Sequence, residues 1–181
     1  LKGILALLSG SVLAQFITFV SSPYLSRIYP PDAFGVWAVH NSVVMILVLL
    51  AAGRYELAIV LPAEDTESKK ILRQAFLINF CSLALLLVFF LTTSSFWAEF
   101  LKIPAQPLLF VCIAVSTFLF AGIQILSYWN TRKKNVTLIS SSRVIQSLVM
   151  LGSNVIFAFS PMQPWGLVLG TTLGQAACFF F

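Results

Sequence analysis

The stretch LVLLAAGRYELAIVLP, Leu47 to Pro62, is an apolar run interrupted by two charged residues. Arg54 and Glu56 stand two positions apart in the middle of it. An unpaired charge is costly in a soluble core and rarer still in a segment that crosses lipid. The residues around this run therefore decide both the class of the fold and the meaning of the two charges.

The composition of the whole chain is that of an integral membrane protein. The chain of 181 residues is 59% hydrophobic and 9% charged, whereas an average soluble domain is about 25% charged. Its mean hydropathy is +0.96, and it contains 17 phenylalanines. The first apolar run is longer than that of a signal peptide and is followed by more of its kind, so we expect no cleavable leader.

The net charge of +5 indicates membrane orientation rather than nucleic-acid binding, because the basic residues lie at the ends of apolar runs. Cys81, Cys112 and Cys178 each stand alone in an apolar run, without a CxxC motif or a Cys/His cluster. We therefore expect no disulfide framework, no metal site and no cofactor.

The apolar runs predict an all-α fold, a polytopic bundle of about six transmembrane helices. A helix needs about 20 apolar residues to cross the hydrocarbon core. The predicted helices cover residues 4–26, 34–61, 73–97, 107–129, 142–160 and 165–181. The links between them contain proline, charge or small polar residues, which end helices, and they are too short for a soluble domain.

The distribution of Lys and Arg predicts a cytoplasmic N-terminus, by the positive-inside rule. With that orientation only Arg27 and Lys102 lie outside, and Arg54 lies within a span. The residues placed inside are Lys2, Lys69, Lys70, Arg73, Arg132, Lys133, Lys134 and Arg143.

Polar residues recur at helical spacing on the first, fourth and fifth predicted helices, so that each helix carries a polar stripe. One interpretation is hydrogen bonding between helices, since small polar residues hold membrane bundles together. The other is a hydrated cavity lined by several helices, and stripes on three helices favour it. The predicted lining residues are Arg54, Gln15, Thr18, Ser22, Gln124, Tyr128, Arg143 and Asn154.

On a helix that starts near Phe34, Arg54 would lie about 30 Å along the axis, near the inner interface. Its side chain could extend to the headgroups there. The five apolar residues after Glu56 favour a position inside the membrane instead. His40 and Arg54 would then share one face of the helix. An arginine that faces a cavity suits a translocated anion, because guanidinium binds phosphate oxygens.

Two titratable residues, Glu56 and His40, are the candidate ion-coupling groups. On a continuous helix Glu56 would point away from Arg54, toward Arg143 or the basic TRKK segment. A separate motif lies in the last helix, where Gly166, Gly170 and Gly174 form GxxxGxxxG. This motif predicts close helix packing rather than ligand binding.

Two stretches resemble one known family. YLSRIYPPDAFGVWAV, Tyr24–Val39, resembles the first external turn of bacterial polysaccharide flippases, and GRYELAIVLP, Gly53–Pro62, with the following AEDTES, is similar to the end of their second helix. These are translocases of O-antigen or capsular repeat units, in the multidrug/oligosaccharidyl-lipid/polysaccharide exporter superfamily.

The resemblance implies a transporter of twelve to fourteen helices in two lobes, of which residues 1–181 would be the N-terminal lobe. Its substrate would be an undecaprenyl-diphosphate-linked oligosaccharide, flipped by alternating access across the bacterial inner membrane for lipopolysaccharide or other surface polysaccharide. The expected partners are this lipid-linked oligosaccharide, membrane lipids and the missing C-terminal lobe, with no nucleic acid.

Three alternatives remain open. A multidrug antiporter of the same superfamily would need buried carboxylates for its cations, and Glu56 is the one intramembrane acid predicted. A membrane glycosyltransferase or polymerase would need paired acids or a nucleophile with histidine, but the aspartates are Asp32 and Asp65 alone and there is a single histidine. A scaffold would use every polar stripe for packing. We therefore expect a transporter and not an enzyme.

Overall fold

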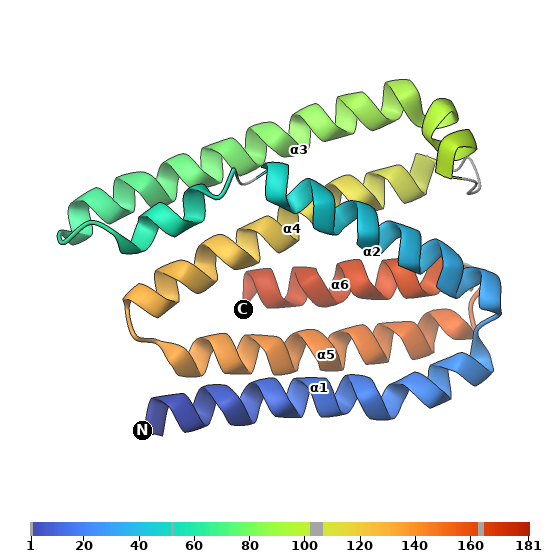
Figure 1. Cartoon of the computed structure of the whole chain (residues 1–181). Coiled ribbons are helices and arrows are strands. Elements are labelled where there is room, and N and C mark those ends of the chain that lie inside the picture. The colour runs from blue at the N-terminus through green and yellow to red at the C-terminus, as the bar shows by residue number, and fades with distance from the viewer. Residues whose placement is uncertain (1, 52, 102–106, 163–164) are drawn as a thin grey trace. The chain divides into compact units, whose positions relative to one another are not determined.

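The computed structural model describes residues 2–51, 53–101, 107–162 and 165–181, with side chains described from Gly10 onward except at 52, 98, 101–107 and 163–164. Every element in these ranges is helical, which confirms the predicted all-α class. The elements, labelled in Figure 1, are α1 (Lys2–Ile28), α2 (Pro31–Ala51), the short 3-10 helix η1 (Tyr55–Val60), α3 (Asp65–Leu101), α4 (Pro107–Arg132), α5 (Val136–Ala158) and α6 (Gly166–Phe180).

Four helical segments are long and apolar enough to cross a membrane, as far as the described residues extend. They are Pro31–Ala51, Asp65–Trp97, Leu108–Arg132 and Val136–Ala158. Helix α6 is also apolar but has 15 residues, and α1, with 27 residues, is not among the four. Several apolar spans in one chain identify a multi-pass membrane protein.

The helices form two compact units. Unit 1 contains Leu1–Trp37 and Trp129–Phe181, and unit 2 contains Ala38–Tyr128.

The second predicted helix ends ten residues early, at Ala51 instead of residue 61. Gly53 has φ 53° and Arg54 has φ 57°, both in the left-handed region, where a right-handed helix cannot continue. The six residues of η1 follow directly. The prediction that His40 and Arg54 share one face of a continuous helix is therefore wrong.

Helix α3 begins at Asp65, eight residues before the predicted start at 73, and runs for 37 residues. The acidic residues Asp65 and Glu67 lie in its first turn, where they favour the positive end of the helix dipole. Lys70 pairs with Glu67 at 3.3 Å. This polar segment is therefore the exposed start of a helix and not a loop. Lys102, which was predicted to lie on the outer side, is outside the described residues.

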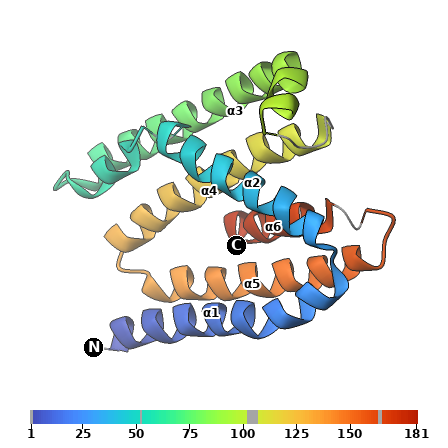
Figure 2. The ribbon, with the colours of Figure 1, turned by 45° about the vertical axis from the view of Figure 1, so that its right-hand side comes forward.

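In unit 1, α1 and α6 both pack along α5 (Figures 1 and 2). Gly10 contacts Ser140 and Tyr29 contacts Asn154, so α1 runs parallel to α5. Gly166 lies against Phe157 and Gly174 against Met150, so α6 runs antiparallel to it.

The glycine stripe of α6 is the face that α5 covers. A Cβ added at Gly174 would lie 2.8 Å from Met150 Cβ and 2.9 Å from the backbone oxygen of Gln146, and one added at Gly170 would meet the Asn154 side chain. The packing interpretation of GxxxGxxxG is confirmed.

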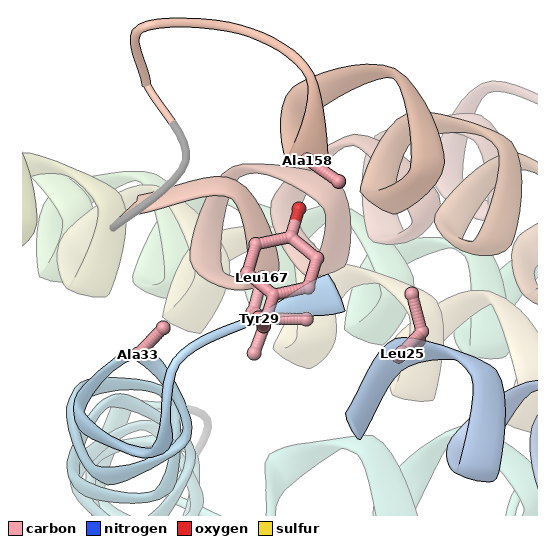
Figure 3. Close-up of a cluster of buried hydrophobic side chains, with 5 residues drawn as sticks. All are labelled: Leu25, Tyr29, Ala33, Ala158 and Leu167. Atoms are coloured by element: carbon pink, nitrogen blue, oxygen red, sulfur yellow. The ribbon is translucent and has the colours of Figure 1, made fainter. Parts of the chain in front are cut away.

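Tyr29 follows directly after α1 and packs against the end of α5. Its ring is buried, and Figure 3 shows it among the other side chains of a cluster, which are Leu25, Ala33, Ala158 and Leu167. The hydroxyl donates a hydrogen bond to the backbone oxygen of Asn154 at 2.6 Å. Burial raises the pKa of Tyr29 from 10.0 to about 12. The tyrosine therefore joins α1 to α5 both through its ring and through its hydroxyl.

In unit 2, α3 packs through one buried face formed by Ala75, Asn79, Leu86 and Phe90, at steps of four and seven residues. Phe90 stacks on Phe110 of α4, with ring centroids 5.4 Å apart. The Asn79 amide donates to the backbone oxygen of Phe118 at 3.1 Å. These contacts hold α3 against α4.

Candidate functional site

The break between α2 and η1 is the feature that places the two charges of the opening stretch. Gly53 N–H donates to the Leu50 oxygen at 3.2 Å, which closes the last turn of α2, and Leu57 N–H donates to the Arg54 oxygen at 3.2 Å, which opens η1. Glycine adopts φ > 0 freely, whereas arginine does so at a cost of about 1–3 kcal/mol. Arg54 is therefore held in its conformation by the structure around it.

Helix α3 contacts the chain on both sides of the break. Ser82 Oγ donates to the Ala51 backbone oxygen at 3.1 Å, and the Tyr55 hydroxyl donates to Gln74 Oε1 at 3.3 Å. Ile59 is completely buried, whereas Leu57 and Leu61 are exposed. The 3-10 helix therefore lies along α3 with one face covered.

Arg54 and Glu56 have opposite environments at this break. The Arg54 side chain is exposed, while Glu56 is 1% exposed and its Oε2 has no hydrogen-bond partner among the described residues. No ion pair joins the two within the part of the chain that the structure describes. The Arg54 guanidinium therefore lies at the surface of unit 2, whereas the Glu56 carboxyl group is buried inside it.

His40 is the second buried titratable residue of unit 2. It is completely buried on α2, and neither ring nitrogen meets hydrogen-bond geometry with another described group. Its polar neighbours are the side chain of Asn41 and the backbone of Cys112 on α4. His40 is therefore enclosed in unit 2 and does not lie on an exposed polar face.

The other predicted lining residues are divided between the two units. On α1, Gln15, Thr18 and Ser22 are exposed, and the Thr18 hydroxyl donates to the Ala14 backbone oxygen of its own helix at 3.0 Å. On α4, Gln124 and Tyr128 are half-buried and one turn apart. Their role in a cavity stays a prediction.

The two lining residues predicted on α5 differ in exposure. Arg143 is exposed, whereas Asn154 is 4% exposed and is packed between α5 and Gly170 of α6. Asn154 also accepts the Tyr29 hydrogen bond through its backbone. The surroundings of Asn154 are those of a packing residue between helices.

Three polar residues that join helices within one unit or the other were missed by the sequence reasoning. Asn79 joins α3 to α4, Tyr29 joins α1 to α5, and Trp37 Nε1 donates to Thr171 Oγ1 of α6 at 2.9 Å. A lone asparagine in the apolar run of residues 75–91 was a signal for a contact between helices. Among the described residues, no three His, Cys, Asp or Glu side chains gather where they could hold a metal ion.

Comparison with known proteins agrees with the sequence resemblance at the level of the family. No curated protein and no solved structure matches the chain. The polysaccharide biosynthesis protein family matches residues 1–180, nearly the whole sequence. The chain therefore belongs to the polysaccharide biosynthesis protein family.

Proposed function

We propose that this protein is a flippase that moves an undecaprenyl-diphosphate-linked oligosaccharide from the cytoplasmic to the outer leaflet of the bacterial inner membrane. Membership of the polysaccharide biosynthesis family and the multi-pass helical fold support this proposal. Translocation of such a lipid needs a polar path for the sugar, a cation for the diphosphate and an apolar flank for the polyprenyl tail. It does not need the acid–base groups of a glycosyltransferase.

The charge distribution supports a cytoplasmic N-terminus. The end of α2 at Ala51 places Arg54 in the connection to α3, together with Lys69, Lys70 and Arg73 near the start of α3. The 11 Lys and Arg residues are then distributed unevenly. All except Arg27 and Lys102 lie closer to those helix ends that the predicted orientation puts on the same side as the N-terminus. Such an excess favours the cytoplasmic side.

Arg54 carries the proposal, because it is an exposed guanidinium at a break between apolar segments. Its left-handed backbone takes it off the α2 helix, and no ion pair with Glu56 occupies it. A guanidinium binds two phosphate oxygens at once, with a strength of about 1.5–3 kcal/mol for a charged hydrogen bond. The competing role is to neutralise the negative C-terminal end of α2, for which any cation serves.

The test uses the complete protein in liposomes that contain a fluorescent undecaprenyl-diphosphate oligosaccharide, with dithionite reporting the outer leaflet. Wild-type protein should accelerate exchange between leaflets. Arg54→Ala should slow it by roughly tenfold to a hundredfold, the rate equivalent of about 1.5–3 kcal/mol. Arg54→Lys should recover only part of this loss, because lysine has no planar fork.

Arg73→Ala is the matched control, since Arg73 is an exposed arginine on the first turns of α3 in the same unit. It should flip the lipid at the wild-type rate. Full activity in Arg54→Ala, or full rescue by Arg54→Lys, would remove the diphosphate contact and leave the capping role.

We also propose Glu56 as the ion-coupling group. Glu56 is buried and its Oε2 has no hydrogen-bond donor among the described residues, so this oxygen is open to an incoming ion. The same feature is what a cation-coupled multidrug antiporter of this superfamily requires, so it favours that function as the second candidate. The two functions differ in cargo and not in the coupling residue.

A pH gradient across the liposome separates these possibilities. Wild-type flipping should respond to the gradient and Glu56→Gln should not, whereas Glu99→Gln, which changes an exposed glutamate of α3, should behave as wild type. A gradient response that persists in Glu56→Gln contradicts the coupling role. Gradient-driven ethidium export without lipid flipping would favour the antiporter.

A further inference from the structure

The turn between α4 and α5 is short and lies between two apolar spans. Leu108–Arg132 and Val136–Ala158 are both long enough to cross a membrane, and only residues 133–135 separate them. So short a link cannot carry its side chains far from the bilayer surface. We call Trp129–Asn135 the basic turn, because it contains Arg132, Lys133 and Lys134 in succession.

The backbone of the basic turn forms a complete helix cap of the Schellman type. Asn135 N–H donates to the Asn130 oxygen at 2.9 Å, and Lys134 N–H donates to the Thr131 oxygen at 3.0 Å. These are the two hydrogen bonds of that motif, and they require a left-handed residue at the position of Lys134. Lys134 has φ 57°.

Lysine is an unfavourable choice at this position, where glycine is the usual residue because it has no Cβ. The turn therefore keeps an exposed cation at a place where the backbone favours a residue without one. Beside it, Lys133 Nζ lies 5.2 Å from the centre of the Trp129 ring. Tryptophan is enriched at the headgroup level of membranes.

Unit 1 contains a single acidic residue. Five of the six acidic residues belong to unit 2, and the sixth, Asp32, lies in the first turn of α2. The Tyr29–Asn154 hydrogen bond places the first turn of α2 near the C-terminal end of α5. Asn154 lies about 27 Å along α5 from Val136, which is next to the basic turn. The N-terminal end of α1 lies instead on the same side as the basic turn, because Gly10 contacts Ser140 near the start of α5 (Figures 1 and 2).

The connection from η1 to α3 is a contrasting case in the same chain. Its basic residues Lys69, Lys70 and Arg73 are matched by Glu64, Asp65 and Glu67, and Lys70 is paired with Glu67. A balanced segment of this kind has little net attraction for an anionic surface. The two connections thus serve as test and control for one another.

We propose that the basic turn is a binding site for the headgroups of anionic phospholipids, with Lys134 as its central cation and Trp129 at the level of the headgroups. A lipid phosphate carries the negative charge that three successive basic residues attract. The position of the turn directly between two spans favours a membrane lipid over a soluble partner. Each basic residue contributes about a fivefold gain in binding to such a surface.

Lys134→Gly provides a test in which stability and binding change in opposite directions. It removes the charge but supplies the residue that the cap favours, so the melting temperature should rise by about 2–4 °C. The affinity of the detergent-solubilised protein for phosphatidylglycerol, titrated by native mass spectrometry, should fall about fivefold. Lys133→Gln combined with Lys134→Gln should lower it about 25-fold. Phosphatidylcholine, which carries no net charge, should bind equally to all forms.

The control variant Lys69→Gln with Lys70→Gln should keep the wild-type preference for phosphatidylglycerol. Unchanged phosphatidylglycerol affinity in Lys134→Gly would overturn the proposal, as would an equal loss in the control variant. Displacement of phosphatidylglycerol by millimolar pyrophosphate would also overturn it, because the turn would then recognise a diphosphate and not a membrane lipid.

Discussion

Replacing Gly174 by alanine tests whether the α5–α6 contact depends on the absence of a side chain. The added Cβ would lie 2.8 Å from Met150 Cβ and 2.9 Å from the Gln146 backbone oxygen, whereas ordinary contact begins at 3.4 Å. The two helices would have to separate by about 0.5 Å, because one of the obstructing atoms belongs to the backbone. Overpacking of this kind costs about 1–3 kcal/mol.

Gly152→Ala is the matched control, since a Cβ added at Gly152 of α5 has no neighbour within 4 Å. Both variants gain about 0.5–1 kcal/mol of helix propensity, so their difference isolates the cost of packing. In detergent, thermal unfolding followed by fluorescence-detected size-exclusion chromatography should place Gly174→Ala roughly 2–12 °C below Gly152→Ala. Equal melting temperatures would refute the close approach of the two helices at Gly174.

Two further predictions concern polar contacts between the helices of unit 1. Tyr29→Phe should remove the tyrosinate absorbance at 295 nm that develops near pH 12, because burial raises the pKa of Tyr29 from 10.0 to about 12. The folded state holds this proton more tightly than the unfolded state. The contribution of Tyr29 to the free energy of unfolding should therefore be constant below pH 10 and decrease as the pH rises toward 12. This decrease should be absent in Tyr29→Phe. Thr171→Val should lower stability by about 1–3 kcal/mol, because the Trp37 indole N–H loses its acceptor. Combined with Trp37→Phe it should cost less than the sum of the two single changes, and additivity in a thermal double-mutant cycle would contradict the bond.

Hydropathy predicts the spans well because the cost of exposing polar groups to lipid dominates the energy of such a chain. The glycine spacing also predicts the contact face of α6, since GxxxGxxxG leaves one side of a helix without Cβ atoms. The start of α3 was missed because an acidic and basic segment resembles a loop in composition. Its charges lie where the helix dipole and the spacing of Glu67 and Lys70 favour a helix.

The candidate site was harder to predict than the fold. Nothing in a run of apolar residues indicates that Arg54 leaves the helical conformation, because arginine has no preference for positive φ. Gly53 and Pro62 were the available signals for a break. Periodicity placed Asn154 on a polar stripe, but it could not say that this stripe meets Gly170 of a neighbouring helix and not a hydrated surface.

The parallel pairing of α1 with α5 has a consequence for how the protein is made. Gly10 contacts Ser140, and the ribosome must add 130 residues between them. At about 5–20 residues per second, α1 waits roughly 6–26 s for its neighbour. Throughout that interval the Gly10 face of α1 lacks the contact with Ser140 that later covers it, whereas Gln15, Thr18 and Ser22 are exposed even in the folded chain. Helix α1 is thus complete long before its neighbour α5, and a membrane insertase or chaperone has time to act on it.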